Sequence, residues 1–352
     1  MKILYFSRSY TPHDFRFLSS IVEGGHKAFF LRLKNGQASE KRPLPKGVHQ
    51  VSGSLKTVLT KIRPDLLHAG PLTDCGYQAA RSGFHPLVQM SWGSDILWDA
   101  KKNASARSRV RFALTHADAL IGDCQAVEKA ATKYRFPNDQ IVIFPWGVDL
   151  SRFSPNGAGD TLRKRHGWQE QFVLLHLRSW EPLYDPLIVA RAFVRAAREN
   201  TRLRLLMPGN GKLKTKLVSI IRKAGMLDRV DFPGQISQDE LPTYFRSSDL
   251  YLSAAQSDGS SVSLMEALAC GLPALVSDIP GNREWIQTGK QGWLFPVGDE
   301  FALAKAILVA ESSERLKAMA RQSRSLAEKK ANWKKNKQLL FQAYEIALES
   351  NS

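Results

Sequence analysis

Residues 257–273 read SDGSSVSLMEALACGLP, and this stretch decides the fold prediction. It sets two carboxylates, Asp258 and Glu266, eight residues apart with a small polar loop between them. The apolar spacing after the loop predicts a helix that begins near Ser261 and contains Glu266. Because the first backbone N–H groups of a helix have no partner within it, they bind anions. The stretch therefore predicts a phosphate pocket flanked by two acceptors for hydroxyl groups, which suits a nucleotide sugar.

Outward from this stretch, short apolar runs alternate with helical stretches twice along the chain. In the first half the expected strands are 3–6, 28–33, 66–67, 87–90, 119–121 and 141–144, with helices at 15–23, 105–115 and 126–133. In the second half the expected strands are 172–176, 203–207, 230–232, 250–252, 274–277 and 293–295, with helices at 187–198 and 213–224. Strands separated by helices form parallel, doubly wound sheets. The sequence therefore predicts an α/β protein with two Rossmann-like domains.

The turn-rich stretch 154–160 is the expected linker between these domains. We predict an N-terminal domain over residues 1–155, a C-terminal domain over 165–333, and a final helix at about 334–352 that packs back on the first domain. Ligands of open α/β sheets bind at the carboxyl ends of the strands. The segments that follow strands are therefore expected to face one cleft; they are 7–14, 92–95, Arg178 and Asp258.

The formal charge of +17 is the most unusual bulk property of the 352 residues. Residues 1–155 hold 22 Lys and Arg against 12 Asp and Glu, and residues 315–337 hold nine basic residues against one acid, Glu328. Such a surface suits nucleic acid, an anionic membrane face or a phosphorylated substrate, and a solvated basic helix is the plain alternative for the tail. Only Trp333 provides an aromatic ring in that tail, so no nucleic-acid partner is expected.

Several classes of protein are disfavoured by what the sequence lacks. The three cysteines are too widely spaced for a disulfide framework or a zinc site, which favours a reducing compartment. Residues 1–7 are too short for a signal peptide, and no run approaches the length of a membrane span. The absence of an Asp-x-Asp pair argues against a metal-dependent transferase, so neither metal nor cofactor is expected. A dehydrogenase is disfavoured because no Gly-x-Gly-x-x-Gly follows the first strand.

Further motifs accompany residues 257–273 in a fixed order. They are FPWGVDLSRF at 144–153, LLMPGNG at 205–211, VDFPGQI at 230–236, and DIPGNRE at 278–284 followed by Gly292. With the acidic-x7-acidic stretch they resemble retaining glycosyltransferases of the GT-B fold, family 4 (glycosyl transferases group 1) type, most weakly at 34–60. Asp258 stands where that family usually has glutamate, and Trp146 where it usually has asparagine. The resemblance implies an acceptor-binding and a nucleotide-sugar-binding domain facing across a cleft.

The resemblance also implies roles for matching residues in the donor site. Glu266 would accept hydrogen bonds from the ribose, Arg178 would neutralise the diphosphate, and Asp258 would contact the donor sugar and support its developing positive charge. The residues implied to bind the diphosphate are Gly259, Ser261, Val262 and Ser263, and those implied to hold the base are Gly234 and Ile236. The alternatives are a solvent-facing acid for Glu266, a helix N-cap for Asp258 and a surface salt bridge for Arg178.

One departure from the family concerns the diphosphate. The family usually follows its arginine with a diphosphate-binding lysine, but residues 179–186 contain none. Lys212 and Lys214, which follow the glycine turn, are the candidates to replace it, and an ordinary solvated lysine is the alternative for each.

Two further departures concern the acceptor. Trp92 ends the fourth strand where the family often has a histidine, so Asp95 becomes the candidate for orienting the acceptor, with capping of the next helix as the alternative. His13 lies in a first loop that lacks the glycines often seen there, and it either contacts acceptor or phosphate or is an ordinary loop histidine. The predicted acceptor-binding residues are thus His13 and Trp92, and the predicted catalytic residues are Asp258, Asp95 and Arg178.

The resulting expectation is a cytoplasmic, retaining glycosyltransferase that moves a sugar from a nucleotide diphosphate donor to a sugar, glycolipid or other anionic acceptor. A front-face route is implied, in which the leaving phosphate oxygen takes the acceptor proton. The rival interpretations are a nucleotide-sugar 2-epimerase and a non-catalytic nucleotide-sugar-binding homologue. Peripheral binding to the inner face of an anionic bacterial membrane is expected through Lys101, Lys102, Arg107, Arg109 and Arg111.

Overall fold

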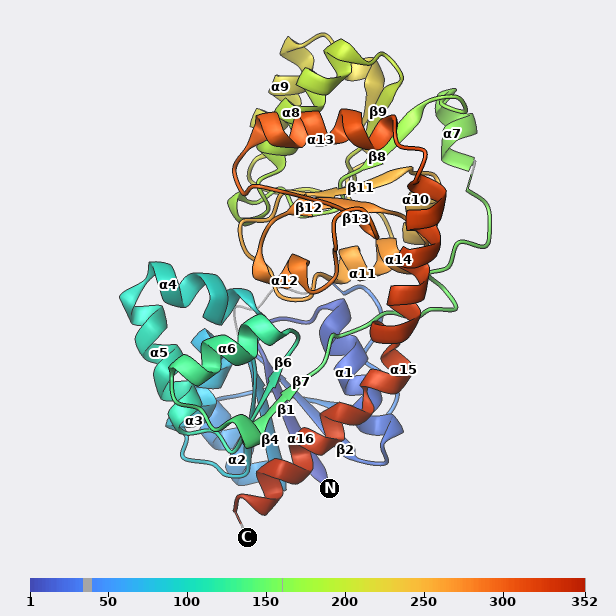
Figure 1. The fold of residues 1–352 in the computed structure, drawn as a ribbon. Coiled ribbons are helices and arrows are strands. Elements are labelled where there is room, and N and C mark those ends of the chain that lie inside the picture. Colours follow the sequence, from blue (N-terminus) through green and yellow to red (C-terminus); the bar gives the residue numbers. More distant parts are fainter. Residues whose placement is uncertain (34–39, 160, 352) are drawn as a thin grey trace. The chain divides into compact units, whose positions relative to one another are not determined.

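The structure, a computed structural model, describes residues 1–33, 40–159 and 161–351. It contains two compact units, each with its own parallel sheet and core (Figure 1). Unit 1 comprises Met1–Trp146 and Lys334–Ser352, and unit 2 comprises Gly147–Trp333. The chain does not divide at the turn-rich stretch 154–160, because Val148 and Phe153 already pack in a core of unit 2.

Seven parallel strands form the sheet of unit 1, in the order β3-β2-β1-β4-β5-β6-β7. They are β1 (Lys2–Ser7), β2 (Lys27–Arg32), β3 (Val48–Val51), β4 (Leu66–Gly70), β5 (Leu87–Met90), β6 (Ala119–Gly122) and β7 (Ile141–Ile143). β1 lies between β2 and β4, so the strand order reverses beside it. Segments that follow β1 and β4 therefore flank the position where open α/β sheets bind ligands.

The helices of unit 1 include one contributed by the end of the chain. They are α1 (Pro12–Glu23), α2 (Leu55–Ile62), α3 (Tyr77–Arg81), α4 (Ala100–Lys102), α5 (Ala104–Thr115), α6 (Gln125–Lys133) and α16 (Gln338–Glu349), with π-helical turns at Leu72–Gly76 and Asp95–Asp99 and a 3-10 turn at Asn138–Gln140. α1 begins three residues before the predicted 15–23, because Thr11 and Asp14 form a capping box around Pro12. The Tyr344 hydroxyl of α16 contacts Nδ1 of His68 in β4 at 2.8 Å, which fixes the final helix to this unit.

Six parallel strands form the sheet of unit 2, in the order β10-β9-β8-β11-β12-β13. They are β8 (Phe172–Leu175), β9 (Leu203–Leu206), β10 (Val230–Asp231), β11 (Leu250–Ser253), β12 (Ala274–Ser277) and β13 (Gly292–Phe295). The helices are α7 (Thr161–His166), α8 (Pro186–Glu199), α9 (Lys214–Lys223), α10 (Leu241–Arg246), α11 (Val262–Ala269), α12 (Pro280–Arg283), α13 (Glu300–Glu311) and α14 (Leu316–Lys330), with 3-10 turns at Pro182–Tyr184 and Leu227–Arg229. α15 (Trp333–Asn336) connects unit 2 to α16.

Both faces of the unit 2 sheet are covered by helices (Figure 1). Alternate residues of β8 point to opposite faces: Leu174 packs with Phe193 of α8, whereas Leu175 packs with Met265 of α11. A parallel strand buried on both faces needs a continuous apolar sequence, as residues 172–175 have. The order of strands places β8 beside β11, so the segments after these two strands are neighbours.

Candidate functional site

The start of α11 is the first component of the candidate site. Ser261 is its N-cap, and the side chain accepts a hydrogen bond from the Leu264 N–H at 3.5 Å. The preceding loop rests directly on α12, since a Cβ added at Gly281 would lie 2.4 Å from the Gly259 carbonyl oxygen and 2.7 Å from that of Asp258. Because the loop is fixed from beneath, the N–H groups of the first helical turn form a preset anion site.

Arg178, which follows β8, points at this helix start. Its Nη2 donates to Asp258 Oδ2 at 2.6 Å, and its Nη1 donates to Ser261 Oγ at 2.5 Å and to Ser263 Oγ at 3.2 Å. The face of the guanidinium lies over the Tyr184 ring, 4.0 Å from its centroid. The structure therefore brings together four of the residues predicted from the sequence and adds Tyr184, which no motif had indicated.

The ion pair between Arg178 and Asp258 is largely shielded from solvent. The side chain of Arg178 is 10% exposed and that of Asp258 is 19% exposed, so the surface-salt-bridge alternative for Arg178 does not hold. Burial lowers the pKa of Arg178, but the charge and hydrogen bond of Asp258, together with Tyr184 and Tyr251, raise it more, and the net pKa lies above the ordinary value. The second carboxylate oxygen of Asp258 accepts the Gly259 N–H at 3.0 Å. The positive charge of Arg178 therefore lies beside the hydroxyl and carboxylate groups at the start of α11.

Glu266 lies on the buried side of α11. It is 6% exposed, so the solvent-facing alternative does not hold. Its charge acts on Tyr251, whose pKa is raised chiefly by burial. The Tyr251 hydroxyl contacts Ser263 Oγ at 2.7 Å, which links Tyr251 to the hydroxyls that hold Arg178. A carboxylate in such a place can accept hydrogen bonds from ligand hydroxyls with little competition from water.

The glycine turn after β9 borders the same end of the sheet. A Cβ at Gly211 would lie 2.5 Å from the Trp180 carbonyl oxygen, so only glycine allows the turn to pack against the segment that carries Arg178. The Gly209 N–H donates to the carbonyl of Gly234 at 2.7 Å, which ties this turn to the loop predicted to hold a base. Ile236 of that loop packs on the core that contains α11.

Lys212 leaves this turn into solvent. Its side chain is 83% exposed, and its Nζ pairs with Glu181 at 3.6 Å. Lys212 therefore lies next to the Arg178 segment, and the contact described for its ammonium group is with Glu181, not with the start of α11.

In unit 1, Asp95 has a structural position that does not favour contact with an acceptor. It is 1% exposed. Its two oxygens accept from Ser91 Oγ at 2.7 Å and from the backbone N–H groups of Leu72 at 2.8 Å, Ile96 at 2.9 Å and Trp92 at 3.3 Å. Burial raises the pKa of Asp95 against the effect of these bonds. The structure does not show capping of the next helix either, because Ser94 is the N-cap of the turn Asp95–Asp99 and no described side chain caps it. Asp95 instead ties the segment after β4 to the segment after β5.

His13 and Trp92, predicted to bind the acceptor, are neighbours. Their rings meet edge to face with centroids 5.4 Å apart, and both side chains are partly exposed. The Trp92 indole N–H is buried and has no hydrogen-bond partner among the described residues. Trp146 at the end of unit 1 is 4% exposed, and its ring packs on Phe17 at 5.0 Å, so it serves the core.

The described residues contain no group of three or more His, Cys, Asp or Glu side chains able to hold a metal ion. Within the same part of the chain, no helix is both long enough and apolar enough to cross a bilayer.

Comparisons with known protein families cover most of the chain. A model described as Glycosyl transferases group 1 matches residues 159–339, and one described as Glycosyl transferase 4-like matches residues 2–125. N-acetyl-alpha-D-glucosaminyl L-malate synthase of Bacillus anthracis is 29% identical over 74% of this chain and 69% of its own length. A GDP-mannose-dependent alpha-(1-6)-phosphatidylinositol monomannoside mannosyltransferase of Mycolicibacterium smegmatis is 25% identical over 68% of this chain and 64% of its own length.

Solved structures share the two-unit fold. Anabaena Alr3699/HepE in complex with UDP-glucose superposes with a TM-score of 0.81 at 19% identity, covering 98% of this chain and 100% of that one. WaaG, a glycosyltransferase involved in lipopolysaccharide biosynthesis, superposes with a TM-score of 0.77 at 15% identity, covering 98% and 99%. The predicted GT-B architecture of two Rossmann-like domains is thereby confirmed.

Proposed function

The chain belongs to the glycosyl transferases group 1 family, and from this we propose that it is a retaining glycosyltransferase that uses a nucleoside diphosphate sugar in glycolipid or polysaccharide synthesis. The observation that carries the proposal is the convergence of Arg178, Asp258, Ser261 and Ser263 on the start of α11. A largely buried cation beside a helix N-terminus suits a diphosphate, because the cation supplies charge and both supply N–H donors to phosphate oxygens.

The proposed donor position follows from these groups. The diphosphate would lie against Arg178 and the first turn of α11, and Glu266 would accept hydrogen bonds from the ribose hydroxyls. The loop that contains Gly234 and Ile236 would hold the base. Support for a donor of this class comes from the HepE complexes, which contain UDP and UDP-glucose.

In the proposed reaction the protein contributes position and electrostatics. The bond between the anomeric carbon and the diphosphate oxygen breaks, and its electron pair leaves with the diphosphate beside Arg178. The acceptor oxygen bonds to the anomeric carbon on the same face, and its proton passes to the departing phosphate oxygen. Asp258 would support the positive charge that develops on the sugar. On the acceptor side, His13 and Trp92 remain the candidates, and Asp95 would act by holding the backbone of Trp92.

The donor test is a thermal-shift screen of UDP-glucose, UDP-N-acetylglucosamine and GDP-mannose. A ligand at ~100 times its Kd stabilises the protein by about 2.7 kcal/mol, which such a screen detects. Glu266→Ala should weaken nucleoside diphosphate binding about tenfold, because it removes a charged acceptor. The matched control Glu199→Ala removes an exposed acid at the end of α8 and should leave binding unchanged.

The stereochemical test is NMR of the product formed with an acceptor. Retention of the anomeric configuration is expected, and inversion would contradict the mechanism. Formation of an epimer from the donor alone would favour the nucleotide-sugar 2-epimerase. Tight donor binding without turnover on glycolipid or saccharide acceptors would favour the non-catalytic homologue.

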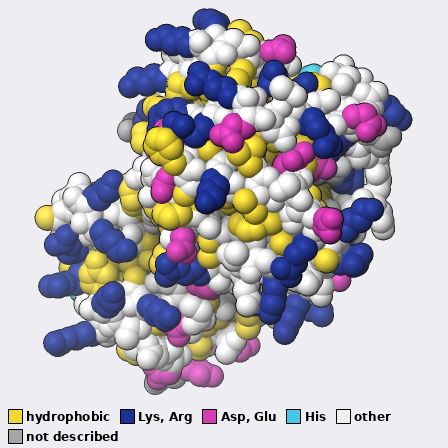
Figure 2. All heavy atoms as spheres, turned by 45° about the horizontal axis from the view of Figure 1, so that its top comes forward, with side chains coloured by type: hydrophobic (Ala, Val, Ile, Leu, Met, Phe, Trp, Pro, Cys, Tyr) yellow, Lys and Arg dark blue, Asp and Glu magenta, His cyan; other side chains and the backbone are white. Residues whose placement is uncertain are grey.

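For the acceptor side, we further propose that unit 1 docks on an anionic membrane through a basic face formed by α3, α4 and α5. Residues 100–117 contain five basic residues and no acid. Aromatic rings lie among the cations: Lys102 Nζ is 3.4 Å from the centroid of Trp98, and Arg81 and Arg109 both lie over Tyr77, at 5.9 and 5.4 Å. Figure 2 shows Lys and Arg side chains around hydrophobic ones on the lobe that carries α4 and α5. Mixed cationic and aromatic surfaces suit the headgroup region of a bilayer.

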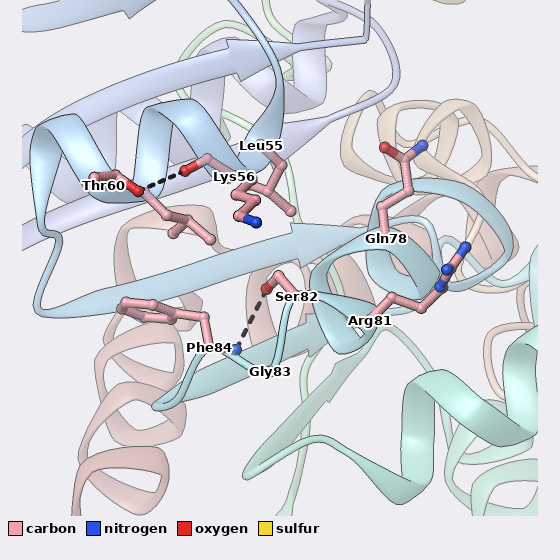
Figure 3. Close-up of a pocket in the computed structure, with 9 residues that line it drawn as sticks. Leu55, Lys56, Thr60, Gln78, Arg81, Ser82, Gly83 and Phe84 are labelled. Carbon is pink, nitrogen blue, oxygen red and sulfur yellow. Dashed lines mark hydrogen bonds between the residues drawn. The ribbon is translucent and has the colours of Figure 1, made fainter.

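A shallow groove of about 690 Å³ continues this face between α2 and the end of α3. Leu55, Leu59 and Phe84 give it apolar walls, while Lys56 and Arg81 stand at its sides. Figure 3 shows the Lys56 amino group pointing from α2 into the groove, toward the segment with Ser82. Apolar walls with cations at the rim match a lipid chain and its phosphate.

Liposome co-sedimentation tests this docking. Replacing Lys101, Lys102, Arg107, Arg109 and Arg111 by Gln should abolish binding to anionic vesicles, and wild-type binding should fade in 1 M salt as the Debye length falls to ~3 Å. A control with Arg198, Lys216, Arg222, Lys223 and Lys305 of unit 2 replaced by Gln removes the same charge. Equal loss in both variants would indicate an effect of net charge alone, and no wild-type binding would contradict the proposal.

A further inference from the structure

The ion pair of Arg178 and Asp258 poses a problem for a ligand that must use Arg178. A buried guanidinium requires a counter-charge, because an unpaired charge away from water is costly. In this structure Asp258 provides that charge at 2.6 Å. A diphosphate at the start of α11 would bring its own negative charges to the same cation, and would place them beside the carboxylate.

The surroundings determine which of these groups can move. The guanidinium is held on three sides, by Ser261 and Ser263 and by the Tyr184 ring. The backbone of Asp258 is held by close contact with Gly281 of α12. The short Asp258 side chain is the more exposed member of the pair, and apart from Arg178 the hydrogen bond described for it is the one from the neighbouring Gly259 N–H. Rotation of this side chain is therefore the movement that the surroundings allow.

We propose that Asp258 is the counter-ion of Arg178 in the empty site and that the diphosphate of the donor displaces it. The inference rests on the proposed function and deepens it. When the phosphate oxygens take over Arg178, repulsion between like charges turns the Asp258 carboxylate away. The oxygen that Arg178 held is then free to accept a hydrogen bond from the donor sugar. Binding of the diphosphate thereby switches on the carboxylate that the reaction uses.

This displacement predicts that loss of an active-site charge strengthens ligand binding, which is the opposite of the usual effect. Because Asp258 competes with the diphosphate for Arg178, the two are negatively coupled, and removing the carboxylate charge should tighten diphosphate binding. A permanent ion pair in which Asp258 only orients Arg178 gives the opposite sign, since its loss would loosen the guanidinium and weaken binding.

The experiment is calorimetric titration of UDP, GDP and ADP and of the matching nucleosides at low salt. Asp258→Asn should bind the preferred nucleoside diphosphate about fivefold more tightly than wild type, a coupling typical of linked sites. Its nucleoside affinity should be unchanged, and its turnover should fall. Asp258→Ser serves as a second variant if Asp258→Asn does not fold. The control is Glu300→Gln, which removes the carboxylate that Arg191 Nε contacts at 2.5 Å elsewhere in unit 2, and it should bind as wild type does.

The outcomes separate this inference from the proposed function. Suppose that wild type binds a nucleoside diphosphate and that Asp258→Asn and Asp258→Ser bind it equally or more weakly. That result would overturn the displacement but leave the proposed function standing. Tighter binding in Glu300→Gln as well would show a general charge effect and would also overturn it. If wild type binds none of the three nucleoside diphosphates, both the proposed function and the inference fail.

Discussion

The two units treat the polar residues at the carboxyl ends of their strands differently. In unit 2, Arg178 meets the side chains of Asp258 and Ser261, which lie together in a segment 80 to 83 residues further along the chain. In unit 1, the carboxylate of Asp95 is used by three backbone N–H groups and the Ser91 hydroxyl around it. A charged residue after a strand therefore indicates a binding site only when its partners are side chains that a ligand can replace. A carboxylate whose oxygens already accept hydrogen bonds from the backbone stabilises the fold and has no free position for a ligand.

The largest effect expected from this comparison is at Arg178. Arg178→Ala should lower kcat about 10²- to 10³-fold, as removal of a group that stabilises a developing charge typically does. The measurement is turnover of the donor identified by the screen. Arg202→Ala, which removes an arginine that is 62% exposed, is the control and should keep wild-type kcat. A loss of less than about fivefold in folded Arg178→Ala would mean that the cluster in unit 2 is framework, as in unit 1.

Asp95 should show the opposite pattern, with stability lost and donor binding kept. Asp95→Ala leaves four buried donors without their acceptor, and each unsatisfied group costs about 1–3 kcal/mol before relaxation. We expect unfolding of unit 1 to require about 3 kcal/mol less, measured by chemical denaturation, while affinity for the nucleoside diphosphate stays at the wild-type value. A stable variant that binds donor but fails to use acceptor would restore Asp95 to the acceptor site.

The sequence predicted this contrast only in part. Most strands of both sheets are predictable because their apolar runs are long enough to be recognised in the sequence. The cluster around Arg178 is predictable because two motifs lie at the ends of adjacent strands. The run Val48–Val51 is half exposed and interrupted by polar residues, so β3 was missed, and α2 after it is only eight residues long. The stacking of Tyr184 on Arg178 depends on a turn at Pro182–Tyr184 that leaves no periodic signal. The end of unit 1 at Trp146 depends on where Val148 packs, which composition does not reveal.

Each unit also contains a buried histidine, so the stability of both units is expected to depend on pH. Burial lowers the pKa of His68 in unit 1 to about 3 and that of His176 in unit 2 to about 4. Below pH 6.5, the ordinary pKa of histidine, these side chains bind protons in the unfolded chain but stay neutral in the folded units. Stability should therefore fall as pH drops from 6.5 toward those values, by up to ~1.4 kcal/mol per pH unit for each histidine.

The variants His68→Asn and His176→Asn assign this loss to each unit. The free energy of unfolding of each variant should differ less between pH 7 and pH 5 than that of wild type, because one buried histidine is gone. Carboxylates such as Asp14 and Asp95 contribute equally to all three proteins and cancel in the comparison. If removal of both histidines leaves the pH dependence of wild type, the acid sensitivity comes from other groups.

The smallest effect is expected at Lys212, one of the two candidates for the family's missing lysine. An exposed ion pair such as that with Glu181 contributes about 0–1 kcal/mol, and its ammonium group keeps most of its hydration. Lys212→Ala should therefore weaken nucleoside diphosphate binding by about threefold or less, and 0.5 M salt should remove that difference by screening. Lys214→Ala removes the other candidate, which is also exposed, and is the matched comparison. A loss near 100-fold in Lys212→Ala alone would mean that Lys212 leaves Glu181 and closes on the phosphates. Unit 2 would then use two cations for the diphosphate, and Arg178 alone would not be sufficient to bind it.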